Sequence, residues 1–220
     1  MRLAAAGSVS LSLLVLAGCA STAPSTGAPP PPPPPPGPSG EVRLDWRGIV
    51  TSGDRDRYQR RDAAWTLALE QARSQPGSGD LSAVGDLIEP RAAQAGVTPP
   101  VGDYRCRTVK LGSQGGRDGL GYVVYGWFAC RIEQTSRGLK FSKLTGSQRP
   151  SGLLFPEDDR QMVMLGSMAL ASEPAANSYG QRPDRDLVAV LERFGADRWR
   201  LVIPWPENES NLDLIELVPA

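Results

Sequence analysis

Residues 186–204, DLVAVLERFGADRWRLVIP, contain two β-strand patterns joined by a short turn. In the second half apolar and basic residues alternate, with Trp199, Leu201 and Ile203 on one side of the chain and Arg198 and Arg200 on the other. A period of two is typical of a strand with one buried face. The Gly195-Ala196-Asp197 sequence between the two halves is typical of a turn. The stretch therefore predicts an antiparallel hairpin.

The same pattern extends over the chain from Val101 onward, where Gly, Pro and Asp interrupt β-rich segments. Eight strands are predicted, over residues 102–111, 121–133, 139–145, 152–155, 160–170, 186–194, 198–204 and 212–218. Mostly short connections favour antiparallel pairing, and so many consecutive strands need closure or a second sheet to protect their edges. We expect an α+β fold that is mainly β, with an antiparallel eight-stranded barrel or a strongly curved sheet of the calycin type.

Two helices are predicted before the strands. Residues 55–74 carry apolar side chains at helical spacing, with Asp54 as the expected N-cap, and Gln75-Pro76-Gly77 ends this segment. A shorter helix is predicted over residues 81–89, before Pro90. We expect both helices to pack on the β-structure, with Trp65 as an anchor in the core.

The N-terminus is typical of an exported protein. A basic start precedes the apolar residues 3–16, a run that is too short to cross a bilayer and is built like a secretory signal. Its ending, Leu16-Ala17-Gly18-Cys19, resembles the bacterial lipobox. Residues 1–18 are therefore predicted to be a lipoprotein signal peptide, and Cys19 the lipidated residue. Because Ala20 rather than aspartate follows, the pattern resembles sorting to the outer membrane, with the folded domain in the periplasm.

Residues 19–40 form the predicted tether between the lipid and the domain. They consist almost entirely of Ser, Thr, Ala, Gly and Pro, with an unbroken proline run over residues 29–36. Such a segment cannot bury apolar surface, and the proline run in polyproline II is a spacer of roughly 25 Å. Residues 41–220 remain as a single domain that is long enough to bury a core.

The two cysteines that remain after Cys19 are Cys106 and Cys130, one in each of the first two predicted strands. In an exported protein such a pair favours a disulfide over a metal or catalytic site. Cys130 shares a strand face with Val124, Phe128 and Ile132. We expect a bridge between neighbouring strands on a common side of the sheet.

Composition excludes several classes of function. The 220 residues include 24 basic, 24 acidic and no histidine, so the Ser-His-Asp and Cys-His catalytic groups and the HExxH zinc site are excluded. Gly-rich residues 112–121 precede no predicted helix and therefore do not indicate a phosphate-binding loop. With zero net charge and no basic face, no nucleic-acid partner is expected. The sequence predicts no cofactor and no metal site.

One polar stretch stands out as a candidate binding segment. Residues 142–152, SKLTGSQRPSG, combine two cations with hydroxyl and amide donors. Lys143, Ser147 and Arg149 are the candidate contacts for a ligand or an anion, and a purely structural loop is the alternative. The acidic clusters at residues 157–159, 184–186 and 207–213 are interpreted as solvated turns, although a glycosidase would need two facing carboxylates.

Several of these segments together resemble a known family. They are residues 102–107, 143–152, 185–187 with 192–193, 198–201, and 209–213 with 216–217. They are similar to the proteobacterial family called domain of unknown function 4893, over most of residues 45–219. The resemblance implies a single domain, and it implies no activity, substrate or cofactor.

Two functional hypotheses follow from the sequence. The first is a non-enzymatic outer-membrane lipoprotein whose periplasmic β-domain binds an apolar or amphipathic small molecule or an envelope protein. The second is a hydrolase that uses paired carboxylates on a cell-wall glycan. A cavity lined inside the barrel favours ligand binding, a filled core with a flat patch favours a protein partner, and opposed carboxylates in a groove favour hydrolysis.

Overall fold

The computed structural model describes residues 45–220. The predicted signal peptide, the lipidated Cys19 and the proline-rich tether all lie outside the described residues. Within residues 45–220, no helix is both long and apolar enough to cross a membrane.

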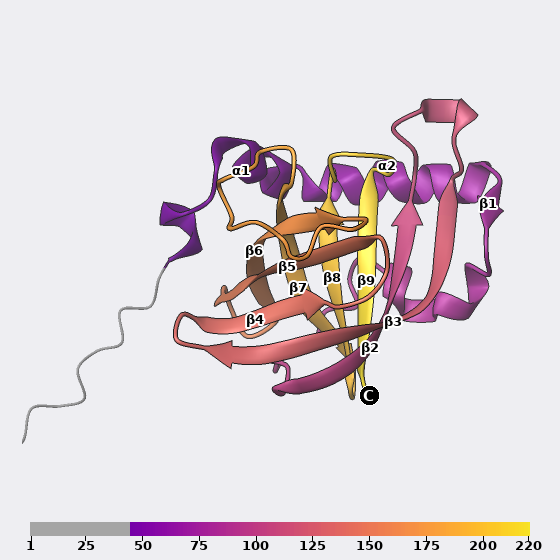
Figure 1. Ribbon diagram of the computed structural model, residues 1–220. Coiled ribbons are helices and arrows are strands. Elements are labelled where there is room, and N and C mark those ends of the chain that lie inside the picture. Colours follow the sequence, from indigo (N-terminus) through magenta and orange to yellow (C-terminus); the bar gives the residue numbers. More distant parts are fainter. Residues whose placement is uncertain (1–44) are drawn as a thin grey trace, which may run out of the picture. The chain divides into compact units, whose positions relative to one another are not determined.

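The core of the domain is a closed barrel of antiparallel strands (Figure 1). Its strands are β2 (Gly102–Leu111), β3 (Tyr122–Thr135), β4 (Gly138–Lys143), β5 (Gln148–Pro156), β6 (Gln161–Leu170), β7 (Asp186–Gly195), β8 (Arg198–Pro204) and β9 (Leu212–Pro219). Each strand pairs with its neighbour in the chain, and β2 pairs with β9 to close the ring. The two-residue strand β1 (Gly77–Ser78) adds a short parallel pair to β3. The predicted mainly β fold and its eight-stranded barrel are confirmed.

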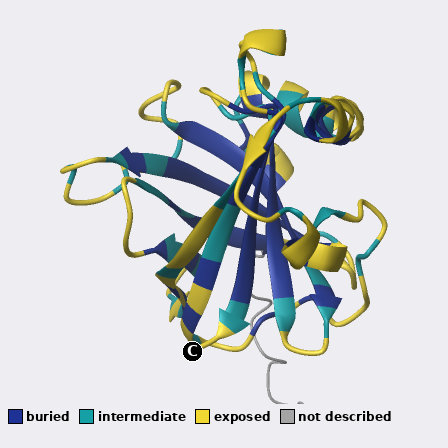
Figure 2. Ribbon diagram, turned by 90° about the vertical axis from the view of Figure 1, so that its right-hand side faces the viewer, coloured by how far each residue is buried: buried dark blue, intermediate teal, exposed yellow. Residues whose placement is uncertain are grey.

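The barrel interior is filled by side chains. One apolar cluster collects inward residues of all eight strands. The residues of β6 to β9 are mostly buried, which is the class drawn dark blue in Figure 2. The predicted hairpin contributes Trp199, Leu201 and Ile203 to this cluster, each less than 5% exposed. Arg198 and Arg200 take the other face, as the alternation predicted. Within residues 45–220 the barrel interior is therefore packed with apolar side chains, which disfavours a ligand cavity inside it.

A disulfide joins the neighbouring strands β2 and β3 on the interior face of the barrel. Cys106 and Cys130 are bonded, and both are fully buried, as expected. The sequence separation of 24 corresponds to roughly 3 kcal/mol of stabilisation in the chain-entropy account. Phe128 and Ile132 share this interior face, but Val124 packs on the opposite side because the β2–β3 register shifts between Arg107 and Val109. The expectation for Val124 was therefore wrong.

The N-terminal helices differ in detail from the prediction. The segment predicted as one helix is two, α1 (Ser52–Gln59) and α2 (Arg61–Ser74), with the break at Arg60. Thr51, not Asp54, is the N-cap, and Asp54 is buried in the first turn. The Thr51 hydroxyl accepts a hydrogen bond from the Asp54 backbone N–H, whereas the Asp54 carboxylate accepts from Arg57 and Tyr179 and does not cap the helix.

The second predicted helix is a kinked 3-10 segment, η2 (Ser82–Ile88). Gly85 within it has a φ of 53°, a conformation that glycine adopts at little cost and that interrupts a regular helix. Short 3-10 turns also occur at η1 (Trp46–Gly48) and at η3 (Gly116–Asp118) in the glycine-rich hairpin loop.

Helix α2 packs across the outside of β8, β9 and β2 (Figure 1). Trp65 lies in this interface, 7% exposed, and its ring faces the guanidinium of Arg200 at 5.1 Å. Arg200 itself is completely buried and pairs with Glu192 at 2.7 Å. It also donates to the backbone carbonyls of Leu87 and Glu89. One arginine thus attaches α2 and η2 to the barrel wall.

A second apolar cluster covers the outside of β5, β6 and β7. Trp46 and Val50 pack there against Phe155, Val163 and Leu165. The connection between β6 and β7, residues 171–185, passes over the same side of the barrel. We call it the covering segment.

Candidate functional site

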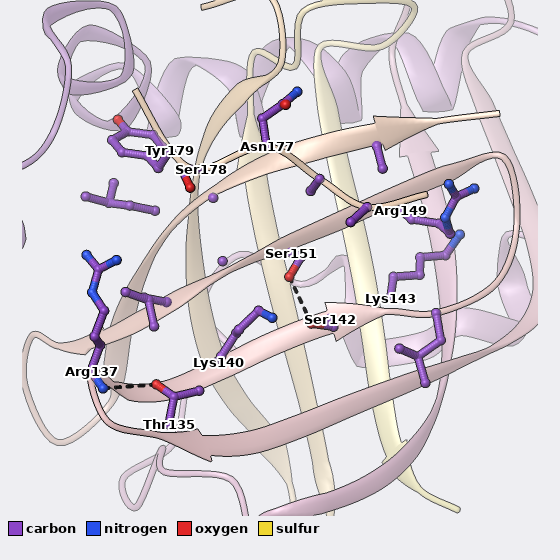
Figure 3. A pocket seen from close by; sticks show the side chains of 18 of the residues that line it. Thr135, Arg137, Lys140, Ser142, Lys143, Arg149, Ser151, Asn177, Ser178 and Tyr179 are labelled. Atoms are coloured by element: carbon purple, nitrogen blue, oxygen red, sulfur yellow. Dashed lines mark hydrogen bonds between the residues drawn. The ribbon is translucent and has the colours of Figure 1, made fainter. Parts of the chain in front are cut away.

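A groove lies outside the barrel and is the candidate site (Figure 3). It lies between the outer face of β4–β6 and the covering segment, and has a volume of about 550 Å³. Figure 3 shows Asn177, Ser178 and Tyr179 above it, with Lys140, Ser142 and Ser151 below. Strand alternation explains this floor, because every second residue of these strands points away from the filled interior.

The groove is lined by both polar and apolar side chains. Ser142 and Ser151 are register partners on β4 and β5, and their hydroxyls share a hydrogen bond of 2.8 Å. Leu153, Leu165 and Ile49 also line the groove, and Leu153 is the register partner of Lys140. Figure 3 shows Lys140, Arg137 and Thr135 on the Tyr179 side of the two serines. The groove therefore offers hydroxyl groups and an apolar surface side by side.

The charged residues that line the groove are all basic. They are Arg137, Lys140, Lys143 and Arg149, and no Asp or Glu lines it. Lys140 is paired with Glu133 at 3.2 Å. Arg137, Lys143 and Arg149 have no ion pair within residues 45–220, and Figure 3 shows Lys143 and Arg149 near the end of the groove opposite Tyr179. Lys143 is the register partner of the buried Cys130 and lies on the Phe128 ring, so its ammonium is on the interior side of the barrel wall.

Lys143 is an unusual lysine. It is 6% exposed, its ammonium lies 3.8 Å from the centre of the Phe128 ring, and it donates to the Gln148 carbonyl at 2.8 Å. Burial, together with repulsion from Arg149 and Lys110, lowers the pKa of Lys143 to about 8. The amine is therefore partly neutral at mildly alkaline pH.

Arg149 links strand β5 to the covering segment. Its guanidinium donates to the carbonyls of Gly146 at 2.7 Å, Ala171 at 2.8 Å and Glu173 at 2.5 Å. These are neutral acceptors, so they leave the positive charge uncompensated. Three of the five guanidinium N–H groups are used, and two remain for another partner.

The other end of the covering segment is fixed by Tyr179. Its hydroxyl donates to the Asp54 carboxylate at 2.7 Å and accepts from the Thr51 backbone N–H at 3.1 Å. Burial raises the pKa of Tyr179 well above its ordinary value, so the phenol keeps its proton. The two anchors, Arg149 and Tyr179, hold the segment over the groove.

The candidate contacts predicted from sequence are partly brought together. Lys143 and Arg149 both line the groove, whereas Ser147 does not, and its backbone carbonyl accepts from Ala171 N instead. The covering segment was not recognised as part of a site. Its signal was its length, since a long connection without secondary structure inside a compact domain is often functional.

The acidic clusters form no facing pair across the groove. Glu157 accepts from Trp46, Asp184 from Arg182 and Asp186 from the Gly180 backbone N–H. Within residues 45–220, no group of three or more metal-ligating side chains is arranged to hold a metal ion.

A second cluster lies at one mouth of the barrel. Lys110, 6% exposed, pairs with Glu209 at 2.9 Å and with Asp213 at 3.2 Å. Burial opposes its charge, but the two carboxylates outweigh burial and raise the pKa of Lys110. The cavity beside this cluster has a volume of about 50 Å³, which suits water rather than a sugar.

The domain matches the model of a known protein family. A family model described as "Domain of unknown function (DUF4893)" matches residues 46–217. The chain belongs to this family. The DUF4893 match includes α1, α2, the covering segment and nearly all of the barrel, so the groove is part of the family's domain. No curated protein and no solved structure matches this DUF4893 chain.

Proposed function

We propose that this DUF4893 chain is a lipid-anchored protein of the bacterial outer membrane whose periplasmic barrel domain binds a small amphipathic molecule in the external groove. The observation that carries the proposal is the lining of the groove, which joins apolar side chains to hydroxyl and basic groups without any carboxylate. Ligand sites typically combine an apolar wall with a few polar groups that fix orientation.

The size of the groove supports a small molecule. Its volume of about 550 Å³ lies within the usual range for ligand pockets. The filled interior directs the ligand to the outside of the barrel, unlike the lipocalin arrangement. Hydrolysis by two carboxylates finds no support in the groove, because no acidic residue lines it.

The groove is tested with octyl phosphate, an eight-carbon amphiphile, used below its micelle concentration. Titration of the ¹⁵N-labelled domain is expected to shift the amide signals of β4, β5 and the covering segment. Replacing Ser151 with tryptophan places an indole on the floor, and is expected to weaken binding at least tenfold by calorimetry. A folded variant is verified by its circular dichroism spectrum.

The matched control is Ser147→Trp, the same change at an exposed residue outside the groove. This variant is expected to bind like the parent chain. Unchanged affinity in Ser151→Trp, or shifts confined to other parts of the barrel, would place the ligand elsewhere and refute the groove as the site.

The anchor has its own test in the full-length chain. Cys19→Ser removes the thiol that receives the lipid, and a single acyl chain or none gives at most marginal membrane binding. The variant is expected to move from the membrane fraction to the soluble fraction after cell lysis. Cys106→Ser/Cys130→Ser, which leaves Cys19 in place, is expected to stay with the membranes. Membrane fractionation of Cys19→Ser like that of the parent would disprove the lipoprotein assignment.

A further inference from the structure

One edge of strand β3 has no neighbouring strand along part of its length. Strand β1 pairs with residues 122–123 of β3, and β4 pairs with residues 130–135 (Figure 1). Leu144 extends the second pairing by one residue, because its N–H donates to the Ala129 carbonyl at 2.8 Å. Within the described part of the chain, no strand pairs with residues 125–128 on this side. We call these residues the β3 edge.

The main-chain groups of Trp127 point toward the open side of the β3 edge. The Ala129 N–H donates to the Thr145 hydroxyl at 3.0 Å and its carbonyl accepts from Leu144, so both groups of Ala129 face away from β2. Main-chain groups two residues apart in a strand point to the same side. The N–H and C=O of Trp127 therefore face away from β2 as well, and neither has a hydrogen-bond partner within residues 45–220. An added strand needs such a donor and acceptor.

The β3 edge is exposed to solvent. Tyr125, Gly126 and Trp127 are all exposed, and Trp127 reaches 44%. In a regular strand with one packed face, every second residue is buried. The β3 edge departs from this rule because Tyr125 and Gly126 lie opposite the single residue Thr108, where the register of the β2–β3 pairing shifts. The main chain of β3 is therefore accessible at this point.

Arginines lie beside the β3 edge on the outer face of the barrel. The guanidinium groups of Arg105 and Arg107 lie 5.2 and 5.0 Å from the centre of the Trp127 ring. Arg107 shares the Glu216 carboxylate with Arg198. Arg105 has no ion pair among residues 45–220. Positive charge on this face is therefore only partly compensated.

A shallow hollow of about 460 Å³ adjoins the β3 edge. The residues that line it include Arg105, Trp127, Ala129, Arg131, Leu144 and Ala220. Arg131 is compensated by Asp103 at 2.7 Å, whereas the carboxylate of Ala220 forms no ion pair with either arginine in the described part of the chain. A side chain of a strand added at the β3 edge can occupy this hollow, between an aromatic ring and the unpaired Arg105.

The charge of this face favours one kind of occupant. Two copies of the chain joined at this edge would each bring an uncompensated arginine to the contact, and like charges repel. Residues 19–40 of the chain contain no acidic residue, and their many prolines lack the N–H that an added strand donates. We propose that the β3 edge is a docking site for an extended acidic peptide of a partner protein, which adds a strand antiparallel to β3 in line with β4. Trp127 supplies the main-chain hydrogen bonds, and Arg105 binds a carboxylate of the peptide.

The first test uses a blocked six-residue peptide in which glutamate and valine alternate. Its titration into the ¹⁵N-labelled domain is expected to shift the amide signals of residues 125–129. The Trp127 amide is expected to exchange with solvent about tenfold more slowly in the complex, because it then donates to the peptide. The same peptide with lysine in place of glutamate is expected to bind about tenfold more weakly, and an N-methylated acidic peptide not to bind.

The second test reverses the charge that selects the peptide. Arg105→Glu is expected to weaken binding of the acidic peptide about tenfold by calorimetry, and to strengthen binding of the lysine peptide. Arg160→Glu is the matched control, since it makes the same change at an exposed arginine between β5 and β6. This control is expected to bind the acidic peptide within about twofold of the parent affinity. Circular dichroism verifies that both variants are folded.

The outcomes distinguish this site from the groove and from self-association. Ser151→Trp, which fills the groove, is expected to bind the acidic peptide like the parent chain. An unchanged Trp127 exchange rate in the complex, or tight binding of the N-methylated peptide, would refute strand addition. Equal affinity for the lysine peptide would refute the acidic preference. A concentration-dependent dimer in sedimentation velocity that protects the Trp127 amide without peptide would identify a second copy as the occupant and overturn the proposal, as would a lack of peptide binding.

Discussion

Replacing Arg200 with methionine is expected to lower the free energy of unfolding by about 3–5 kcal/mol, the usual result of breaking a buried ion pair from one side. The guanidinium is fully buried, and its loss leaves the Glu192 carboxylate unpaired. It also removes the donors for the Leu87 and Glu89 carbonyls. For a domain of this size the melting temperature is expected to fall by about 10 °C. Urea unfolding and calorimetry measure both quantities.

Two further variants separate the buried charge from the packing. Arg200→Met/Glu192→Leu leaves no unpaired charge and is expected to recover a substantial part of the loss. Arg117→Met removes an exposed arginine and is expected to change stability by less than about 0.5 kcal/mol. A loss below about 1 kcal/mol in Arg200→Met would show that Trp65 and η2 hold the wall without the arginine.

Replacing Asp213 with asparagine is expected to cost about 2–3 kcal/mol at pH 7. The substitution keeps the shape of the side chain but leaves the buried Lys110 ammonium with Glu209 as its remaining carboxylate partner. Because Glu209 is more than half exposed, its attraction is weakened by solvent, and the estimate lies below the full value for a broken buried pair.

The cost of Asp213→Asn depends on pH in a defined direction. The pKa of Lys110 is raised in the folded chain, so its contribution to stability is fully present below about pH 10.5 and is lost as the pH rises through its folded pKa. The gap between the parent and Asp213→Asn is therefore expected to be full at pH 7 and smaller at pH 11, as measured by urea unfolding. Asp118→Asn, at an exposed residue, serves as the control. A constant gap over this range would contradict the assigned pair.

The strands could be predicted from sequence because their signal is local. The alternation of Trp199, Leu201 and Ile203 with arginines is expected for any strand that has one buried face. Every strand of the barrel has such a face, because one side of it packs into the interior. The break at Arg60 has no comparable signal, because the residues on both sides of it favour a helix. The position of Val124 depended on an irregular pairing with β2, which the sequence of β3 alone does not show.

The candidate site could be predicted only in part. The sequence indicated Lys143 and Arg149 because cations are rare between residues 141 and 159. It could not show that Lys143 is buried beside Phe128, since that contact joins two strands. Nor could it show that Tyr179 reaches Asp54 across more than a hundred residues. Contacts between distant segments create the groove.

The pairing of β2 with β9 also sets the order in which the domain can be completed. Every other pair of barrel strands joins neighbours in the chain and can form as soon as its hairpin exists. The register from Tyr104 with Pro219 to Leu111 with Leu212 waits for the last strand. While the chain is synthesised from its N-terminal end, the free edge of β2 therefore stays open to other chains until β9 arrives. The slowest and most aggregation-prone stage of folding is expected at this single seam.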